Sequence, residues 1–542
     1  MKNEISNILN QIKVGNTTKA LEDAKLYYKK NTNELDAIKL LAYSYIQVGN
    51  FEKVISVLEN GYKGREQKKD FDYFNNVGYA LSQIEEYEES LIALNKAIAI
   101  NDKNIGTHTT ISEIYLKLRE FKRAEEFILN AFKMILDKGE DIYDKHANVF
   151  LLISEINSAL KKDSKTIKVF NEILKKKFNA NIFFLLMNVD PKSIELSEAS
   201  SIENRLLKSE EEFQNKIERF NYVTPLHFGL GMYYQSLDQK KSEIFFDKAN
   251  KEILNNTRYN SHQYQERINK IMALYINKYK SYDENESQYG ENNFFIIGSP
   301  RSGTTLVESI VTANDKVFSG GELKSCKDII ERNVLSAEQN FGGLSHQFLS
   351  KYIRRTKHLK GSCDFIVDKM PENFLYLGII LKLMPKSKIL RIFRNPWDIA
   401  VSLYRQRYIL NVPYSVSFFN IGIFLANFEA INLFWNNNIE KKQNVMDVKY
   451  EDLVLNFDDY QKKIYSFLGI NAKYEDKIRK QFFSSTASIR QVKEGIGLKS
   501  YEKKEFMHHK AEFIDSFFMQ RQYWASKEIV PENTSFFGYP IK

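Results

Sequence analysis

The sequence predicts a fold in two parts: an all-α solenoid of repeats, followed by an α/β domain with a central parallel sheet. Two observations predict this division. A phrase recurs through the first half of the chain with a period near 34 residues, and from residue 294 onward strand-like apolar runs alternate with helix-like segments. The chain has 542 residues, of which 43% are hydrophobic and 27% charged, as is typical of a soluble globular protein.

The repeats are recognised from one position. Gly15 in KVGNTTKALEDA has counterparts at Gly49, Glu85 and Arg119, with steps of 34, 36 and 34 residues between them. A small or moderately sized residue follows each of them by five positions, which lets two helices approach closely. These residues are Ala20, Val54, Ser90 and Ala124. The pattern resembles tetratricopeptide repeats, and a generic helical bundle is the alternative.

The predicted boundaries follow the strength of this pattern. It weakens after residue 140, where 147–174 is expected to form another helical pair, and it returns at 226–253. We predict a helical solenoid over residues 1–275, a linker over 276–293 that ends in the polar stretch DENESQYGENN, and a second domain over 294–542.

Four apolar runs are the predicted strands of the second domain. They are 294–298, 365–369, 388–394 and 444–453. Strands that alternate with helices indicate a parallel sheet, and ligands of such sheets bind at the carboxyl ends of the strands. Polar residues that directly follow these runs are therefore the candidates for a site.

The stretch after the first strand, SPRSGTT, predicts an anion site. Backbone N–H groups around a glycine, the start of a helix, two hydroxyls and an arginine can all hold an oxyanion. The candidate ligand-binding residues are Pro300, Arg301, Ser302, Gly303, Thr304 and Thr305. A phosphate loop of a nucleotide hydrolase would have a lysine where Thr304 stands, so a single phosphate with one attached group fits better than a triphosphate. The alternative is a strand-to-helix turn without a ligand.

The stretch RNPWDIAVS predicts a second anion site. Arg394 ends a strand, Asn395 is expected to cap the next helix, and Ser402 lies about two helical turns further on. In the alternative interpretation Arg394 forms a local ion pair with Asp398 and Ser402 is merely packed. Together the two sites imply a nucleotide phosphorylated at two distant points.

These two motifs resemble those of the sulfotransferase family over about residues 290–535. The closer likeness is to tyrosylprotein sulfotransferases and to bacterial sulfotransferases preceded by tetratricopeptide repeats. The resemblance implies a P-loop-like sulfotransferase domain, 3′-phosphoadenosine 5′-phosphosulfate (PAPS) as sulfate donor, the bisphosphate PAP as product, and no metal. PRSGTT then matches the 5′-phosphosulfate loop and R-N-P-W-D-x-x-x-S the 3′-phosphate motif, so the lysine of a phosphate loop is not needed.

The resemblance also implies roles for single residues. Glu322 matches the catalytic base, and its pKa is open at this point, because burial would raise it and Arg301 would lower it. Lys369 matches a lysine that contacts the leaving oxygen, with pairing to Asp368 or Glu372 as the alternative. Arg301 and Ser488 are the other catalytic candidates. Ser488, Tyr450 and Lys503 match positions that contact the donor, Lys503 most loosely.

Two departures from the family pattern concern specificity. Tyrosylprotein sulfotransferases carry arginines shortly after the catalytic glutamate, where this chain has Leu323, Lys324 and Asp328, so specificity for acidic peptides is in doubt. Gln406 stands where the second arginine of the 3′ motif is expected, between Arg405 and Arg407.

Composition narrows the partners. The net charge of +9 is dispersed rather than gathered in a basic stripe, which argues against nucleic acid. Two cysteines and an N-terminus without a signal peptide favour a reducing, cytoplasmic compartment, and the family resemblance implies a bacterial one. The composition also predicts no membrane span and no metal. We expect an acceptor with a hydroxyl, on a glycan, a peptide tyrosine or a small metabolite, and a protein or peptide partner bound through the repeats. The alternatives are a P-loop kinase or hydrolase, with Asp368 offered to Mg²⁺, and a repeat-based scaffold whose nucleotide domain is inactive.

Overall fold

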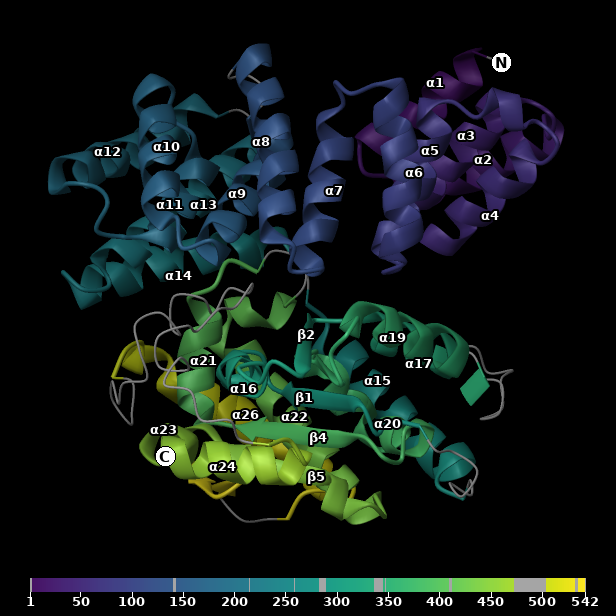
Figure 1. Ribbon diagram of the computed structural model, residues 1–542. Coiled ribbons are helices and arrows are strands. Elements are labelled where there is room, and N and C mark those ends of the chain that lie inside the picture. Colours follow the sequence, from purple (N-terminus) through teal and green to yellow (C-terminus); the bar gives the residue numbers. More distant parts are fainter. Residues whose placement is uncertain are drawn as a thin grey trace. The chain divides into compact units, whose positions relative to one another are not determined.

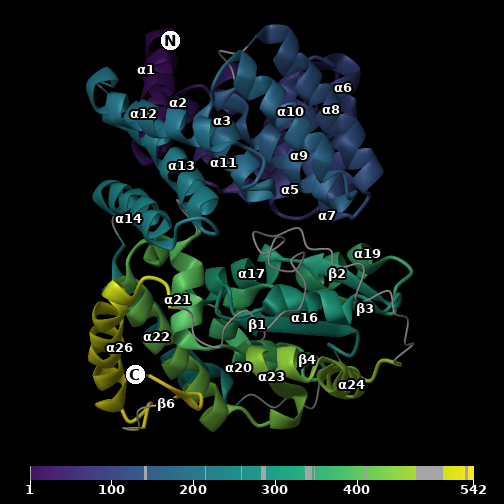
Figure 2. The same ribbon diagram turned by 90° about the vertical axis from the view of Figure 1, so that its left-hand side faces the viewer.

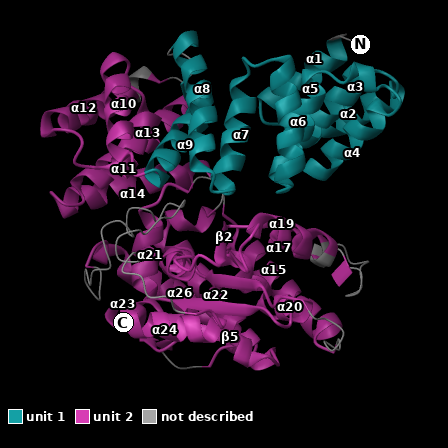
Figure 3. Cartoon of the chain, in the orientation of Figure 1, with its two compact units in different colours: residues 1–160 teal, residues 161–542 magenta. Residues whose placement is uncertain are grey.

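The computed structural model divides into two compact units, residues 1–160 and 161–542 (Figure 3). It describes residues 2–139, 143–213, 215–257, 259–281, 289–335, 345–346, 348–408, 412–471, 504–531 and 535–541. The boundaries predicted near residues 275 and 293 mark where the repeats end and the second domain begins. The division into compact units does not test them, so they stay a prediction.

Unit 1 is an array of helices joined by short turns (Figure 1). Its helices are α1 (Lys2–Lys13), α2 (Thr17–Lys30), α3 (Leu35–Gln47), α4 (Phe51–Tyr62), α5 (Phe71–Gln83), α6 (Tyr87–Ile100), α7 (Ile105–Lys117), α8 (Phe121–Lys138) and α9 (Ala147–Ala159), with short 3₁₀ turns at Glu66–Lys68 and Asp144–His146. Each predicted repeat is thus a pair of helices.

The position that marks the repeats is the turn inside each helix pair. Gly15, Gly49, Glu85 and Arg119 all adopt left-handed backbone conformations, with φ of 81°, 73°, 64° and 62°. The following amide closes the helix end in the same way each time, as when Glu120 N donates to the Tyr115 carbonyl at 2.8 Å. This is the glycine-type C-cap of an α-helix, which two of the four turns build without glycine.

The small residues of the repeats lie where helices touch. Ala20, Val54, Ser90 and Ala124 are fully buried. A Cβ atom on Gly78 would come within 2.6 Å of the Leu94 side chain, and the Ser90 hydroxyl donates to the Gly78 carbonyl at 2.6 Å. Close helix packing therefore explains why these positions repeat.

Unit 2 begins with six further helices. They are α10 (Asp163–Lys176), α11 (Ala180–Val189), α12 (Leu196–Glu212), α13 (Lys216–Tyr234), α14 (Gln239–Asn256) and α15 (Ser261–Leu274), and a π-helical turn follows at Tyr275–Tyr279. The pair α13–α14 repeats the device of unit 1, because Ser242 donates to the Gly231 carbonyl at 2.7 Å. The return of the pattern at 226–253 is therefore a helical pair, as predicted.

A five-stranded parallel sheet forms the centre of unit 2, with strand order β2–β3–β1–β4–β5. The strands are β1 (Asn293–Gly298), β2 (Val317–Gly321), β3 (Phe365–Asp368), β4 (Lys388–Phe393) and β5 (Val445–Lys449). Figure 1 shows β1, β4 and β5 side by side. The chain order reverses between β1 and β4, and ligands of open parallel sheets bind at the carboxyl ends beside such a point.

Four of these strands were predicted, and two corrections are needed. β2 was not predicted, because its sequence VFSGG has few of the apolar residues that mark a strand. The predicted strand 444–453 ends at Lys449, where the helix α23 (Tyr450–Leu455) begins. Glu451 and Asp452 in its first turn favour that helix start.

Helices cover both faces of the sheet. On one face, Ile296 and Ile392 pack into a core with α16 (Thr304–Val311) and α24 (Phe457–Leu468). On the other face, Phe393 contacts Phe428 of α22 (Phe418–Asn438) at 6.0 Å between ring centroids. The remaining elements are α17 (Lys324–Leu335), α19 (Arg354–Lys360), α20 (Leu377–Leu383), α21 (Pro396–Tyr404) and α26 (Lys510–Ala525), with short turns at Leu349–Ile353, Pro371–Tyr376, Pro413–Val416, Lys442–Asn444 and Met507–His509 and the β6–β7 pair (Ser535–Phe536, Tyr539–Pro540). The predicted fold class is thereby confirmed.

Helix α22 is long and apolar enough to cross a membrane by length and composition alone. However, 83% of its most apolar stretch is buried inside the protein. It packs along α26 (Figure 2), and its Glu429 accepts a hydrogen bond from Arg521 of α26 at 2.9 Å. A buried ion pair on its surface is a property of a core helix rather than of one that faces lipid.

Candidate active site

The loop after β1 forms a tight turn over residues 299–303. Arg301 has φ 70° and Gly303 has φ 104°, while the amide of Ser302 donates to the Ser299 carbonyl at 3.1 Å. Alternating left-handed residues turn backbone N–H groups toward one concave side, and the first turn of α16 adds its N-terminal N–H groups there. The turn therefore has the shape that the SPRSGTT motif predicts for an anion site.

Gly303 is required by a close contact with Tyr450. A Cβ atom at residue 303 would lie 2.3 Å from Cδ2 of Tyr450, a separation that no side chain tolerates. The same Tyr450 ring lies beneath the Arg394 guanidinium, whose central carbon is 4.3 Å from the ring centroid. Tyr450 thus connects the loop after β1 with the end of β4.

The two predicted anion sites are neighbours. Nη1 of Arg394 donates to the Arg301 carbonyl at 3.3 Å, and Nε of Arg301 donates to the Ser402 hydroxyl at 2.9 Å. The Arg301 side chain, predicted for the first site, therefore reaches the serine of the second. Arg394 also lies 3.5 Å from Asp398, so the local ion pair considered as an alternative is present as well.

The start of α21 follows the sequence prediction. Asn395 caps the helix, because its side chain accepts hydrogen bonds from the amides of Trp397 at 3.0 Å and Asp398 at 3.2 Å. Pro396 takes the first helical position, where its missing N–H costs nothing. This cap fixes the direction of α21 and so places Ser402 beside Arg301.

Buried donors at both motifs have no partner among the described residues. They are the Ser302 hydroxyl and Nε of Arg394. Burial lowers the pKa of Arg301, the Tyr408 hydroxyl opposes this, and nearby Arg394 lowers it further. Two buried guanidiniums side by side, with unsatisfied donors around them, favour a bound anion.

A second group of charges lies after β2 and β3. The amide of Lys369 donates to the Gly321 carbonyl at 2.8 Å, which ties the two strand ends together. Nζ of Lys369 then lies 2.6 Å from Oε1 of Glu322 and 3.8 Å from Oε2 of Glu308. Lys369 is only 1% exposed, whereas the Glu322 side chain is 44% exposed. The glutamate therefore has access to an incoming molecule.

Lys369 keeps its charge. Burial by itself would lower the pKa of Lys369, but Glu322 and Glu308 raise it above its ordinary value. Glu308 is held in place, because its Oε1 accepts a hydrogen bond from Ser319 at 2.6 Å. The site thus contains one buried ammonium group between two carboxylates.

The partners of this group differ in part from the sequence-based expectation. Lys369 is a cation in direct contact with Glu322, at 2.6 Å. The alternative partners of Lys369 are engaged elsewhere: Asp368 accepts a hydrogen bond from Tyr352 at 2.7 Å, and Glu372 pairs with Lys327.

Sequence reasoning missed two members of the site, Glu308 and Tyr408. Arg301 donates a hydrogen bond to the Tyr408 hydroxyl, which also lies within electrostatic range of Glu322 and Lys369. Burial raises the pKa of Tyr408, so its hydroxyl stays protonated at neutral pH. Tyr408 lies in RQRY, next to the residues compared with the 3′ motif. This closeness in sequence is the feature that could have identified Tyr408 as a site residue.

Other predicted residues are placed as follows. Thr304 and Thr305 are buried in the first turn of α16, and Pro300 is half-buried. Arg405 pairs with Glu505, and Arg407 lies over the Phe184 ring, 5.3 Å from its centroid, so these two arginines take up contacts away from the 3′ motif. Ser488 and Lys503 lie outside the described residues.

The sequence was compared with protein families and curated proteins. Residues 293–476 match the model of the sulfotransferase family. An uncharacterized protein of Aquifex aeolicus is 25% identical over 289 residues, which cover 49% of this chain and 37% of that protein. A protein-tyrosine sulfotransferase of Drosophila melanogaster is 24% identical over 220 residues, which cover 36% of this chain and 42% of that protein. The chain therefore spans less than half the length of these two relatives.

Two solved structures are similar at low TM-scores. The C-terminal part of a TPR repeat-containing protein from Cytophaga hutchinsonii has 14% identity and a TM-score of 0.32, and the match covers 47% of this chain and 96% of that one. A sulfotransferase from Mycobacterium tuberculosis has 12% identity and a TM-score of 0.25, with 56% and 98% covered. At these TM-scores neither likeness carries an argument about function.

Proposed function

Residues 293–476 of this chain form a domain of the sulfotransferase family, preceded by helices of tetratricopeptide type, and on this premise we propose that the protein is a PAPS-dependent sulfotransferase. It moves a sulfuryl group from PAPS to a hydroxyl of its acceptor. The observation that carries the proposal is the direct contact between the two anion motifs, in which Arg394 donates to the Arg301 carbonyl and Arg301 donates to Ser402.

The residues of both motifs suit a nucleotide with two phosphate groups. The turn after β1, with Ser302, Thr304 and Thr305, supplies donors for the 5′-phosphosulfate. Arg394 and Ser402 supply donors for the 3′-phosphate, and the orphaned Nε of Arg394 is one of them. Tyr450 holds the two sides together. When bound, PAPS supplies an activated sulfuryl group and a phosphate leaving group, so this chain needs to provide only binding, charge and a base.

Glu322 is the proposed base. Its carboxylate is the exposed member of the Glu322–Lys369 pair, and an acceptor hydroxyl can reach it from solvent. Lys369 remains positively charged and fixed by Glu308 even when Glu322 turns to the acceptor. The buried ammonium group is thus available to stabilise negative charge that develops as the proton leaves.

The acceptor is proposed only as a class. A hydroxyl of a glycan, a peptide tyrosine or a small metabolite fits a base at the exposed edge of the site. The helical repeats are proposed to bind a protein or peptide, since stacked helix pairs offer extended surfaces for one. We propose a cytoplasmic location for the reaction.

Calorimetric titration of the full chain with PAP tests donor binding. We expect one site, unaffected by EDTA, and a loss of affinity of about 10- to 150-fold in Arg394→Ala, because a hydrogen bond to a charged group contributes about 1.5–3 kcal/mol. Arg123→Ala, which removes an exposed arginine of unit 1, is the matched control and should bind normally. Absence of heat from the unaltered protein would reject the proposed donor.

Transfer of label from PAPS to a panel of glycans, phenols and tyrosine peptides tests the reaction. Glu322→Gln should retain PAP binding and lose about 10²- to 10⁴-fold of its turnover, the usual contribution of a general base. Turnover equal to that of the unaltered protein would remove Glu322 from this role while leaving donor binding intact. The two assays therefore separate a wrong base from a wrong donor.

A further inference from the structure

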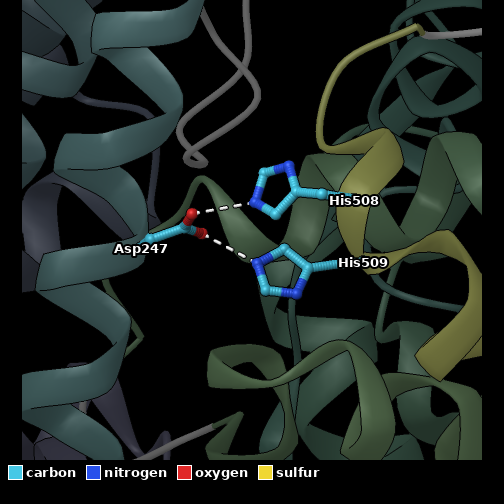
Figure 4. A group of neighbouring side chains, drawn as sticks. All are labelled: Asp247, His508 and His509. Carbon is cyan, nitrogen blue, oxygen red and sulfur yellow. Dashed lines mark hydrogen bonds and ion pairs between the residues drawn. The ribbon is translucent and has the colours of Figure 1, made fainter.

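Three side chains outside the candidate active site converge in unit 2. Asp247 lies on α14, and His508 and His509 form the end of the short turn that precedes α26. Figure 4 shows both imidazole rings turned toward the Asp247 carboxylate. Nε2 of His508 lies 3.0 Å from Oδ2 of Asp247, and Nε2 of His509 lies 3.1 Å from Oδ1.

The spacing of these atoms suits one small metal ion. The ligand atoms of the three residues all lie within 4.8 Å of one another. In a tetrahedral zinc site, bonds of about 2.0–2.2 Å place neighbouring ligand atoms roughly 3.3 Å apart. The two nitrogen–oxygen separations are close to that value, and all three ligand atoms lie within 4.8 Å of one another, so a bound ion would draw the two imidazole nitrogens toward a common centre.

The surroundings of the histidines also match a metal site. Nδ1 of His509 lies 3.3 Å from Oε2 of Glu512, and Nδ1 of His508 lies 3.6 Å from Oε2 of Glu243. Metal-binding histidines commonly donate their second ring N–H to a carboxylate, which leaves the lone pair of the other nitrogen directed at the metal. Here each ring has such a carboxylate on the side away from Asp247.

The third ligand is held in place as well. The Tyr404 hydroxyl donates to Oδ1 of Asp247 at 2.9 Å, and the neighbouring Asn250 donates to the Tyr404 carbonyl at 2.8 Å. The Tyr404 ring in turn packs against Phe506, 5.3 Å away between centroids. The three ligands therefore stand on elements that are already packed against one another.

We propose that Asp247, His508 and His509 bind one divalent ion of the zinc class, with solvent at the fourth position. Two imidazoles and a carboxylate are ligands that Zn²⁺ favours. The ion would link α14 to the chain before α26 and, through Tyr404, to the end of α21, two residues after Ser402. It would brace the wall of the candidate active site without taking part in its chemistry.

Titration of the metal-free full chain with ZnCl₂ tests this proposal. We expect one Zn²⁺ per chain and at least a tenfold loss of affinity in the double variant His508→Gln/His509→Gln. Glu512→Gln should weaken binding by about 10- to 100-fold, as second-shell substitutions do. His262→Ala, which removes an exposed histidine outside the cluster, should bind as the unaltered protein does.

Two further measurements distinguish the loss of a metal site from the loss of folding. Co²⁺ in the site should show the strong visible absorption of a four-coordinate ion, and the double variant should lose it. Tryptophan fluorescence should be unchanged in every variant, which verifies that unit 2 is folded. Equal Zn²⁺ binding by the double variant and the unaltered protein, or absence of stoichiometric binding, would overturn the proposal and leave a cluster joined by hydrogen bonds alone. The readout does not depend on PAPS, so it stands apart from the proposed function.

Discussion

Left-handed backbone at non-glycine residues occurs both in the repeats of unit 1 and in the loop after β1. Glu85 and Arg119 have φ of 64° and 62°, and Arg301 has φ of 70°. In the repeats the conformation ends a helix, and glycine takes the same place in two other repeats, at Gly15 and Gly49. At Arg301 the conformation directs a buried guanidinium to Ser402.

The difference lies in what the side chain contacts. Because the turn of a repeat is closed by backbone hydrogen bonds, glycine can take that position in two of the repeats. Arg301 instead holds Ser402 and Tyr408 with its side chain. Backbone strain by itself therefore does not identify a functional residue, whereas strain combined with buried polar contacts to distant parts of the chain does.

The largest effect is expected for Arg301→Gly. Glycine adopts positive φ without strain, but the buried hydrogen bonds of the Arg301 side chain are lost, so we expect the free energy of unfolding to fall by about 1–3 kcal/mol while the protein stays folded. PAP affinity should nevertheless fall by about 100-fold or more, because a buried charged donor is lost. Calorimetry and urea unfolding measure the two quantities, with Arg119→Gly as the control. Normal PAP binding by Arg301→Gly would show that Arg301 acts like a repeat turn.

The next effect is a pH dependence of folding stability, which we expect to have opposite signs in the two units. Burial, with help from Lys248 and Arg219, lowers the pKa of His227 in α13 to about 4. Below pH 6.5 the unfolded chain binds a proton that the folded state does not, so this residue makes unit 2 less stable as pH falls from 6.5 to 4. Between pH 6.5 and 4, we expect the free energy of unfolding of His227→Phe to fall by about 1–2 kcal/mol less than that of the unaltered protein.

Tryptophan fluorescence during urea unfolding reports this change, since Trp397, Trp435 and Trp524 all lie in unit 2. The control is the same comparison at pH 8, where the two proteins should differ only by the packing of the new side chain. An equal decrease in the free energy of unfolding of both proteins on acidification would show that the imidazole of His227 is not the responsible group.

Unit 1 should respond to pH in the opposite sense through Glu155 of α9. Burial raises the pKa of Glu155 to about 7, although Lys117 opposes this and Glu113 adds to it. Between pH 4.5 and 7 the folded state holds a proton that the unfolded chain releases, so stability falls as pH rises. Because Glu155 is partly exposed, we expect the free energy of unfolding to fall by only about 1 kcal/mol over this pH range. Glu155→Gln should abolish the decrease, and circular dichroism during unfolding measures it. An unchanged pH slope in that variant would contradict the assignment.

The smallest effect should come from the repeat turns themselves. Glu85→Gly and Arg119→Gly remove the strain of a left-handed non-glycine residue, and we expect each to raise the free energy of unfolding by about 0.5–1 kcal/mol. Thermal unfolding followed by circular dichroism measures this, and PAP binding should not change. Destabilisation by either substitution would mean that the side chain contributes more than its backbone costs.

The sequence predicted most of what local patterns encode. The small residues of the repeats, the cap of α21 by Asn395 and the loop around Gly303 each follow from a short local motif. The strand β2 was missed because SGG is a poor strand sequence that the neighbouring β3 stabilises by pairing. Local propensity gives no information about such a tertiary contact.

Contacts between distant segments were the least predictable. Glu308 joins Lys369 only because α16 packs beside the strand ends, and nothing in its own segment ESIV marks it. The metal prediction shows the same limit. His508 and Asp247 are 261 residues apart in the chain, so local metal motifs in the sequence could not reveal them. The sequence therefore predicted no metal, and the Zn²⁺ titration tests that prediction.

The order of the strands also has a consequence for engineering. The motifs proposed for the nucleotide follow β1 and β4, which have neighbours on both sides, whereas Glu322 follows β2 at the border of the sheet, paired with β3 alone. On the proposed function, we therefore expect exchange of the stretch 317–335 to change which acceptors react and to leave donor binding unchanged. Such chimaeras would keep the proposed nucleotide site of this protein and take the residues around the proposed base from the grafted segment.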